Sequence, residues 1–213
     1  MKGYEPDMHD LKGQHIYTPQ RYEQILQRRQ RALDLVNVAL RAIDPRSATV
    51  RALKQLRGHV NLEGSTVFAF GKAAFGMAQG VLDELTPKQG KVHCFQEGEL
   101  GPLKLVKSSH PYPAADAVER GREVLELAQS LSFDDIALCL VSGGGSSMLE
   151  YPLQGVSIEE MTRASAELMK AGADITALNE KRRSLSAIKG GGLAQAIKPA
   201  TIITIIKSSF PSL

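Results

Sequence analysis

The sequence predicts an α/β fold: a mostly parallel sheet with helices on both faces. Short apolar runs at residues 66–70, 103–107, 136–141 and 201–206 alternate with longer segments of helical periodicity. The runs lack the alternation of polar and apolar side chains that a half-exposed strand shows, so we expect both faces of the sheet to be buried. Glycines directly follow two of the runs, which is where ligands bind in sheets of this kind.

The N-terminal region is predicted to contain two helices. Residues 1–18 are polar and unpatterned, and we expect a flexible lead-in. Apolar side chains recur every three or four residues over 19–43, which predicts a helix. Thr18 followed by Pro19 is typical of a helix N-terminus. A shorter helix is expected over 46–56, with its basic side chains on a solvated face.

Helices are also expected between the later strands. Ser157 and Glu160 have the spacing of a capping box, and Asp174 is a typical N-cap. A further short strand is expected at 92–95. The predicted helical segments are 72–85, 114–131, 157–171 and 174–186.

Composition excludes several classes of protein. The 213 residues include 26 Lys plus Arg and 23 Asp plus Glu, and the resulting charge of +3 is too small to predict a nucleic-acid partner. No apolar run approaches 18 residues, so no transmembrane helix is expected. The first residues do not resemble a secretory or transit peptide, and Cys94 and Cys139 lie far apart in apolar runs. A cytoplasmic protein with reduced core cysteines is therefore expected.

The first candidate site follows the predicted strand at 66–70. Gly71 allows the backbone to turn, and the helix start behind it would offer free N–H groups to an anion. Lys72 adds a positive charge at a helix N-terminus, where a cation opposes the helix dipole. That opposition favours a binding role for Lys72; an exposed lysine in a first helical turn is the simpler alternative.

The second candidate site is the glycine loop at 142–147, directly after the strand at 136–141. Its residues are Ser142, Gly143, Gly144, Gly145, Ser146 and Ser147. Three consecutive glycines cost chain entropy, and they let backbone N–H groups approach phosphate oxygens while the serines add hydroxyl donors. The loop favours phosphate or nucleotide binding over a simple tight turn. It matches neither a Walker A loop, nor a dinucleotide fingerprint, nor a serine-hydrolase elbow.

The third candidate segment is basic. Asn179, Arg182 and Ser186 are three and four residues apart, so we expect them on one helical face. The planar guanidinium of Arg182 suits a carboxylate or phosphate, and Lys189 directly precedes the glycines at 190–192. A basic surface helix is the alternative interpretation.

His110 and the acidic residues give weaker signals. His110 lies after the predicted strand at 103–107 and is more typical of a turn than of a catalytic residue. No group of His, Cys, Asp or Glu has the spacing of a structural metal site, so no protein-held metal is predicted.

With these segments in place, the chain resembles the class II glycerate 2-kinase family. Five pieces occur in the family's order between about residues 25 and 200, which makes the resemblance more specific than any single glycine loop. They are Ala42-Ile43-Asp44-Pro45; Phe70-Gly71-Lys72-Ala73-Ala74; His110-Pro111-Tyr112-Pro113; Leu140-Val141 with the glycine loop; and Asn179, Arg182, Leu185-Ser186 and Ile188-Lys189-Gly190-Gly191.

The resemblance implies a Rossmann-like domain over 19–206, a divergent tail at 207–213, and a truncated protein without the family's C-terminal domain. It implies ATP- and Mg²⁺-dependent phosphorylation of D-glycerate to 2-phosphoglycerate. Lys72 and Arg182 would be catalytic, and the glycine loop, Asn179 and Lys189 would bind nucleotide. The implied partner is a small molecule, not nucleic acid or a membrane, and a homo-oligomer is left open.

Two features depart from the family pattern. Ala114 stands where the family usually has an acid, and residues 207–213 replace the acidic turns that help to form its active site. Two other interpretations therefore stay open. One is a catalytically inactive fragment that acts as a nucleotide- or partner-binding module. The other is a sugar-phosphate-binding or oxidoreductase domain, which the missing dinucleotide fingerprint disfavours.

Overall fold

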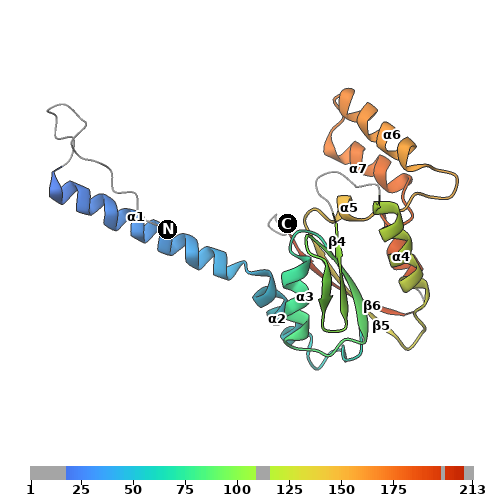
Figure 1. The fold of residues 1–213 in the computed structure, drawn as a ribbon, viewed down its shortest axis with the longest axis horizontal. Coiled ribbons are helices and arrows are strands. Elements are labelled where there is room, and N and C mark those ends of the chain that lie inside the picture. The colour runs from blue at the N-terminus through green and yellow to red at the C-terminus, as the bar shows by residue number, and fades with distance from the viewer. Residues whose placement is uncertain (1–17, 109–115, 198–199, 209–213) are drawn as a thin grey trace. The chain divides into compact units, whose positions relative to one another are not determined.

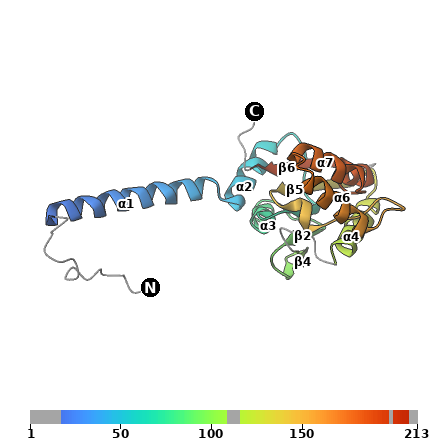
Figure 2. The ribbon, with the colours of Figure 1, turned by 90° about the horizontal axis from the view of Figure 1, so that it is seen from above.

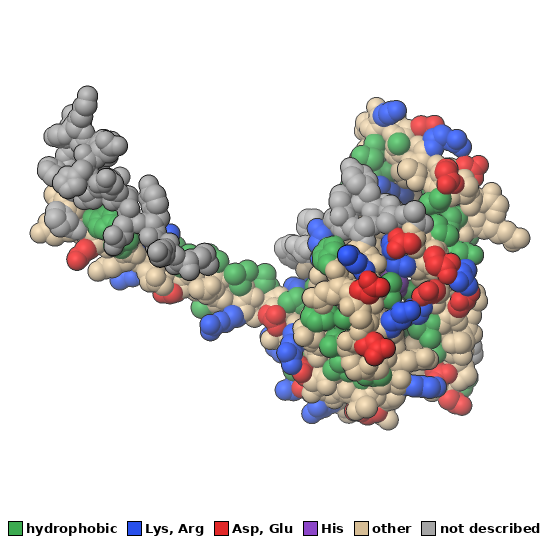
Figure 3. Space-filling view, viewed as in Figure 1, with side chains coloured by type: hydrophobic (Ala, Val, Ile, Leu, Met, Phe, Trp, Pro, Cys, Tyr) green, Lys and Arg blue, Asp and Glu red, His purple; other side chains and the backbone are tan. Residues whose placement is uncertain are grey.

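The computed structural model describes residues 18–108, 116–197 and 200–208. The chain divides into two compact units, residues 1–43 and 44–213. The first unit contains helix α1 (Pro19–Ala42), and the Thr18 side chain caps it by accepting a hydrogen bond from the Arg21 N–H at 3.3 Å. This confirms the predicted helix start. Apolar side chains are exposed along α1 (Figure 3), including Leu35 at 71%.

The second unit is built on a β-sheet (Figures 1 and 2). The sheet has six strands in the order β3-β4-β2-β1-β5-β6. All neighbouring strands are parallel except β3 and β4. The mostly parallel sheet expected from the sequence is therefore confirmed. Its strands are β1 (Thr66–Phe70), β2 (Gln89–Cys94), β3 (Gly98–Leu100), β4 (Leu103–Lys107), β5 (Ile136–Ser142) and β6 (Thr201–Lys207).

Helices cover both faces of the sheet (Figure 1). On one face α2 (Pro45–Leu56) and α3 (Ala74–Leu82) form a core with the strands, and on the other α4 (Ala117–Gln129) and α8 (Gly192–Ile197) form a second core. The remaining helices are α5 (Gly145–Met148), α6 (Ile158–Lys170) and α7 (Ile175–Ser184).

The absence of side-chain alternation in β1 has the predicted cause. Val67 is buried in the core beneath α2 and α3, and the next residue, Phe68, is buried in the core beneath α4 and α8. Successive strand residues point to opposite faces, so an unbroken apolar run is needed where both faces are covered. Cys94 and Cys139 are buried and free, as expected.

Three short elements were missed by the sequence pattern: β3, α5 and α8. Each is too short to show a helical or strand period, so composition alone does not reveal it. The predicted capping box is present, with the Ser157 side chain bonded to the Glu160 N–H and the Glu160 side chain to the Ser157 N–H. His110 and residues 209–213 lie outside the described residues. None of the described helices is long and apolar enough to cross a membrane.

Candidate phosphate-binding site

The topology of the sheet defines one preferred place for a ligand. From β1 the chain moves to β2 and β4 on one side, and then returns to β5 and β6 on the other. The switch point therefore lies between β1 and β5, and ligands of open parallel sheets bind at the carboxyl ends of the strands on either side of such a point. Gly71 directly follows β1, and the glycine loop directly follows β5.

Backbone contacts join these two segments. The Lys72 N–H donates to the Gly143 carbonyl at 2.9 Å, and the Ala73 N–H donates to the Ser142 hydroxyl at 3.1 Å. Gly71 has φ +119°, and a Cβ at this position would lie 2.3 Å from the Ser142 hydroxyl oxygen. Only glycine therefore fits at this junction, and the first two predicted candidate sites form one structure.

The donors of this site differ from the expectation in one respect. The sequence predicted free N–H groups at the start of the helix after Gly71, but those of Lys72 and Ala73 are used to hold the glycine loop. The N–H groups of residues 143–146 have no hydrogen-bond partner among the described residues. Gly144 has φ +88°, and this left-handed conformation reverses the chain between β5 and α5. At the start of α3, the N–H groups of Phe75 and Gly76 likewise have no partner among the described residues, so both segments retain available amides.

A pocket of about 270 Å³ lies beside the glycine loop. Lys189 is the one charged side chain among its lining residues. The pocket is lined by Phe70, Val141, Ser142, Gly144, Gly145, Ser146, Leu149, Ile188, Lys189 and Leu193. The structure thus brings together the glycine loop and Lys189, which are more than 40 residues apart in the sequence.

Lys189 is held by a buried acidic residue. Its ammonium forms an ion pair with Glu150, whose other carboxylate oxygen accepts a hydrogen bond from the Ser186 hydroxyl. The side chain of Lys189 is 13% exposed and that of Glu150 is 6% exposed. Burial lowers the pKa of the Lys189 ammonium to about 8. The sequence analysis missed Glu150, although an acid within the apolar stretch Met148-Leu149-Glu150-Tyr151 is a signal of a buried, paired carboxylate.

The remaining residues predicted for the site do not line this pocket, apart from the contact that Ser186 makes with Glu150. The Lys72 side chain is exposed and is not among the pocket residues. Asn179 is exposed and Arg182 is half-buried on α7, and neither lines the pocket. Ser186 does not share their helical face, because α7 ends at Ser184 and Ser186 forms an isolated bridge with Pro152.

The donor set fits phosphate better than it fits a metal. Amides without partners, serine hydroxyls and one ammonium are groups that bind phosphate oxygens. Within the described ranges, no three His, Cys, Asp or Glu side chains come together to hold a metal ion, and Glu150 is already bonded to Lys189 and Ser186.

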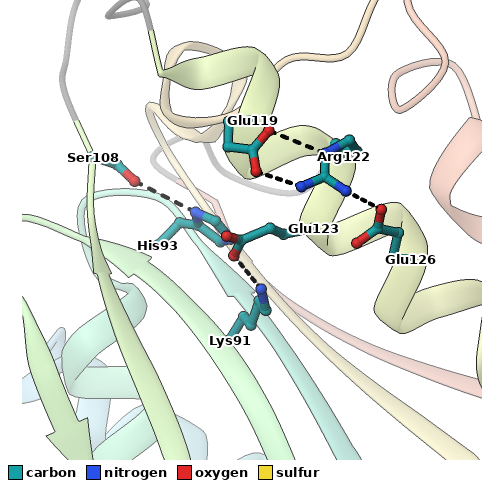
Figure 4. Close-up of polar contacts among 7 residues, drawn as sticks. All are labelled: Lys91, His93, Ser108, Glu119, Arg122, Glu123 and Glu126. Atoms are coloured by element: carbon teal, nitrogen blue, oxygen red, sulfur yellow. Dashed lines mark hydrogen bonds and ion pairs between the residues drawn. The ribbon is translucent and has the colours of Figure 1, made fainter.

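A second polar cluster lies between β2 and α4 (Figure 4). Lys91 on β2 forms an ion pair with Glu123 on α4, and the buried ring of His93 has its Nδ1 3.5 Å from the Ser108 hydroxyl. Burial, together with the positive charges of Arg120 and Lys91, lowers the pKa of His93 to about 3. His93 is therefore neutral at physiological pH and belongs to the packing of the sheet.

Comparison with known proteins agrees with this architecture. A D-glycerate 2-kinase from Thermotoga maritima is 35% identical over 182 residues, which cover 83% of this chain and 43% of the relative. A glycerate 2-kinase from Pyrococcus horikoshii is 34% identical over 188 residues, covering 84% and 43%. The crystal structure of a glycerate kinase from Thermotoga maritima superposes with a TM-score of 0.75 at 34% identity, covering 84% of this chain and 44% of that one.

The chain thus spans less than half the length of these relatives. The predicted resemblance and the α/β fold are both confirmed over the matched part. Residues 31–211 match the family described as "Domain of unknown function (DUF4147)", which extends over most of the chain. The chain therefore belongs to the DUF4147 family.

Proposed function

We propose that this chain is the nucleotide-binding part of an ATP-dependent glycerate 2-kinase. The observation that carries the proposal is the junction at the β1/β5 switch point, where the glycine loop presents free amides beside a pocket containing Lys189. Amides and cations fixed in advance stabilise the charge of a transferring phosphoryl group without reorganising during the reaction. The named activities of the Thermotoga and Pyrococcus relatives support the choice of D-glycerate as the acceptor.

Each candidate residue has a proposed role. The amides of residues 143–146, together with serine hydroxyls of the loop, bind the phosphates of ATP, and Lys189 neutralises part of their charge. ATP supplies the phosphoryl group that is transferred to glycerate. Lys72, exposed directly beside the loop, orients the substrate or the γ-phosphate. Arg182, together with Asn179 on the same helix α7, binds an anionic group.

Nucleotide binding is assigned to this chain, and catalysis also requires the part of the relatives that the chain does not span. The phosphate-binding loop and its pocket lie within the described residues, whereas the described residues offer no free acidic cluster for magnesium. We therefore propose that the chain alone binds ATP but does not catalyse phosphoryl transfer to glycerate. A nucleotide-binding module without catalysis is the second candidate function, and the same experiment separates the two.

The test joins residues 1–207 to the C-terminal half of the Thermotoga relative and measures glycerate-dependent ADP release. We expect activity in the joined protein, and none in the 213-residue chain alone. Lys72→Ala should lower kcat/KM of the joined protein by roughly 10²- to 10³-fold, because a fixed charge at the transferring group is lost. The fold should be unaffected, since the Lys72 side chain is exposed.

Lys170→Ala provides the matched control. Lys170 is also an exposed lysine near a helix end, at the C-terminus of α6. Its replacement should leave kcat/KM unchanged. Equal activities of the two variants would remove Lys72 from the site. ATP binding without ADP release from a folded joined protein would favour the module without catalysis.

A further inference from the structure

We propose that Glu150 is a positioning residue of the phosphate-binding pocket, because its carboxylate keeps the Lys189 ammonium charged and fixed beside the glycine loop. This inference rests on the proposed function and assigns a role to a residue outside the predicted site. Glu150 lies two residues after Met148, the last residue of α5. It does not line the pocket itself, so any effect on a ligand must pass through Lys189.

The two oxygens of the Glu150 carboxylate have separate partners. One oxygen accepts hydrogen bonds from the Ser186 hydroxyl and, at 3.1 Å, from the Tyr151 N–H. The other oxygen binds the Lys189 ammonium. The first set of contacts fixes the plane of the carboxylate, and the second directs a single oxygen at Lys189. A carboxylate held in this way has little freedom to rotate toward the solvent or toward another cation.

Ser186 connects the side chain of Lys189 to its backbone. The Ser186 hydroxyl donates to Glu150 and accepts from the N–H groups of Ile188 at 3.2 Å and Lys189 at 3.1 Å. Both ends of Lys189 are therefore tied to one small network. Ser186 is itself 4% exposed, so water does not compete for these bonds. The ammonium is placed before a ligand arrives, which lowers the entropy cost of binding an anion.

The ion pair between Glu150 and Lys189 determines whether the buried lysine stays charged. Burial of an unpaired ammonium favours its neutral form, and a neutral lysine would not attract phosphate. The Glu150 carboxylate opposes that loss of charge. Arg120 on α4, which donates to the Met148 carbonyl at 2.9 Å, is itself paired with Asp116. The acids of α4 pair with Arg122 or Lys91, and Glu180 on α7 is exposed. Glu150 is therefore the one carboxylate among the described residues that contacts the Lys189 ammonium and favours its charged form.

The test is the variant Glu150→Gln, which keeps the shape of the side chain and one accepting oxygen but removes its charge. The titration of Lys189 is followed by the NMR shift of its Cε carbon, with Lys189→Met identifying the resonance. We expect the midpoint to fall by about one pH unit or more when the carboxylate is lost. ATP binding at pH 8 should weaken by about fivefold or more, and the loss should be smaller at pH 6.5.

A double-mutant cycle separates positioning from general support of the fold. In the Lys189→Met background, Glu150→Gln should have no further effect on ATP binding, because Glu150 acts through the lysine. An equal loss in both backgrounds would overturn the inference, and so would an unchanged Lys189 midpoint in folded Glu150→Gln. If the midpoint shifts but the unsubstituted chain binds no ATP, the proposed function fails and the role of Glu150 in phosphate binding fails with it. The titration does not depend on the nucleotide, so the two failures are distinguishable.

Discussion

Gly71→Ala is expected to destabilise the chain by about 3 kcal/mol or more, the combined cost of backbone strain and of moving a neighbouring strand end. The new Cβ would lie 2.3 Å from the Ser142 hydroxyl oxygen and 2.4 Å from the Ser142 carbonyl oxygen. The backbone carbonyl cannot rotate away as a flexible side chain can. The end of β5 must therefore shift, and the bonds from Lys72 and Ala73 to the glycine loop would be lost. The free energy of unfolding in urea measures the effect.

Gly98→Ala is the matched control for Gly71→Ala. Gly98 has φ +131°, close to the φ of +119° at Gly71, but a Cβ there meets no atom within 4 Å. Its replacement should cost only the strain of the backbone, about 1–2 kcal/mol. Losses of equal size in the two variants would show that β1 and β5 are not in tight contact at Ser142.

Stability is expected to fall by about 2 kcal/mol between pH 7 and pH 5 through His93 alone. The folded-state pKa of His93 is lowered to about 3, mainly by burial, from an ordinary value of 6.5. Below pH 6.5 the unfolded chain therefore binds a proton that the folded chain does not, and acid favours unfolding. The penalty begins near pH 6.5 and grows until the folded-state pKa is reached. Urea denaturation at pH 5, 6 and 7 measures it.

His93→Gln should flatten this pH dependence, whatever its effect on stability at pH 7. The control is His59→Gln, because His59 is exposed in the turn after α2. That variant should keep the slope of the unsubstituted chain. If His93→Gln retained the full slope, the acid sensitivity would belong to other groups, such as the carboxylate of Glu123 paired with Lys91.

Much of the fold is predictable because it depends on local patterns. The apolar run of β1 matches its observed bounds, and the capping box at Ser157 marks the start of α6. The order of the strands is not local. Nothing in the residues 66–70 shows that β1 pairs with β2 on one side and β5 on the other. The antiparallel β3, three residues long, is likewise determined by its partner β4 and not by its own sequence.

The candidate site was likewise predictable where it depends on local sequence and not where it depends on long-range contacts. The glycine loop is visible in the sequence because three glycines are costly unless the backbone needs them. The use of the Lys72 and Ala73 amides to hold that loop depends on contacts between residues about 70 apart, so the sequence pattern gave the opposite expectation. Lys189 was found by its place before the glycines at 190–192. Its partner Glu150 was not, because an ion pair between separate loops has no fixed spacing.

The most direct test of the phosphate-binding site is a titration of the ¹⁵N-labelled chain with ATP and magnesium, observed through the backbone amide resonances. We expect the largest shifts at residues 143–146, whose N–H groups have no partner among the described residues, and smaller shifts at Lys72 and Lys189. Gly98 and Gly155, which lie outside the pocket lining, should not move. If the resonances of the glycine loop remain unchanged while ATP binds elsewhere or not at all, the proposed site is wrong.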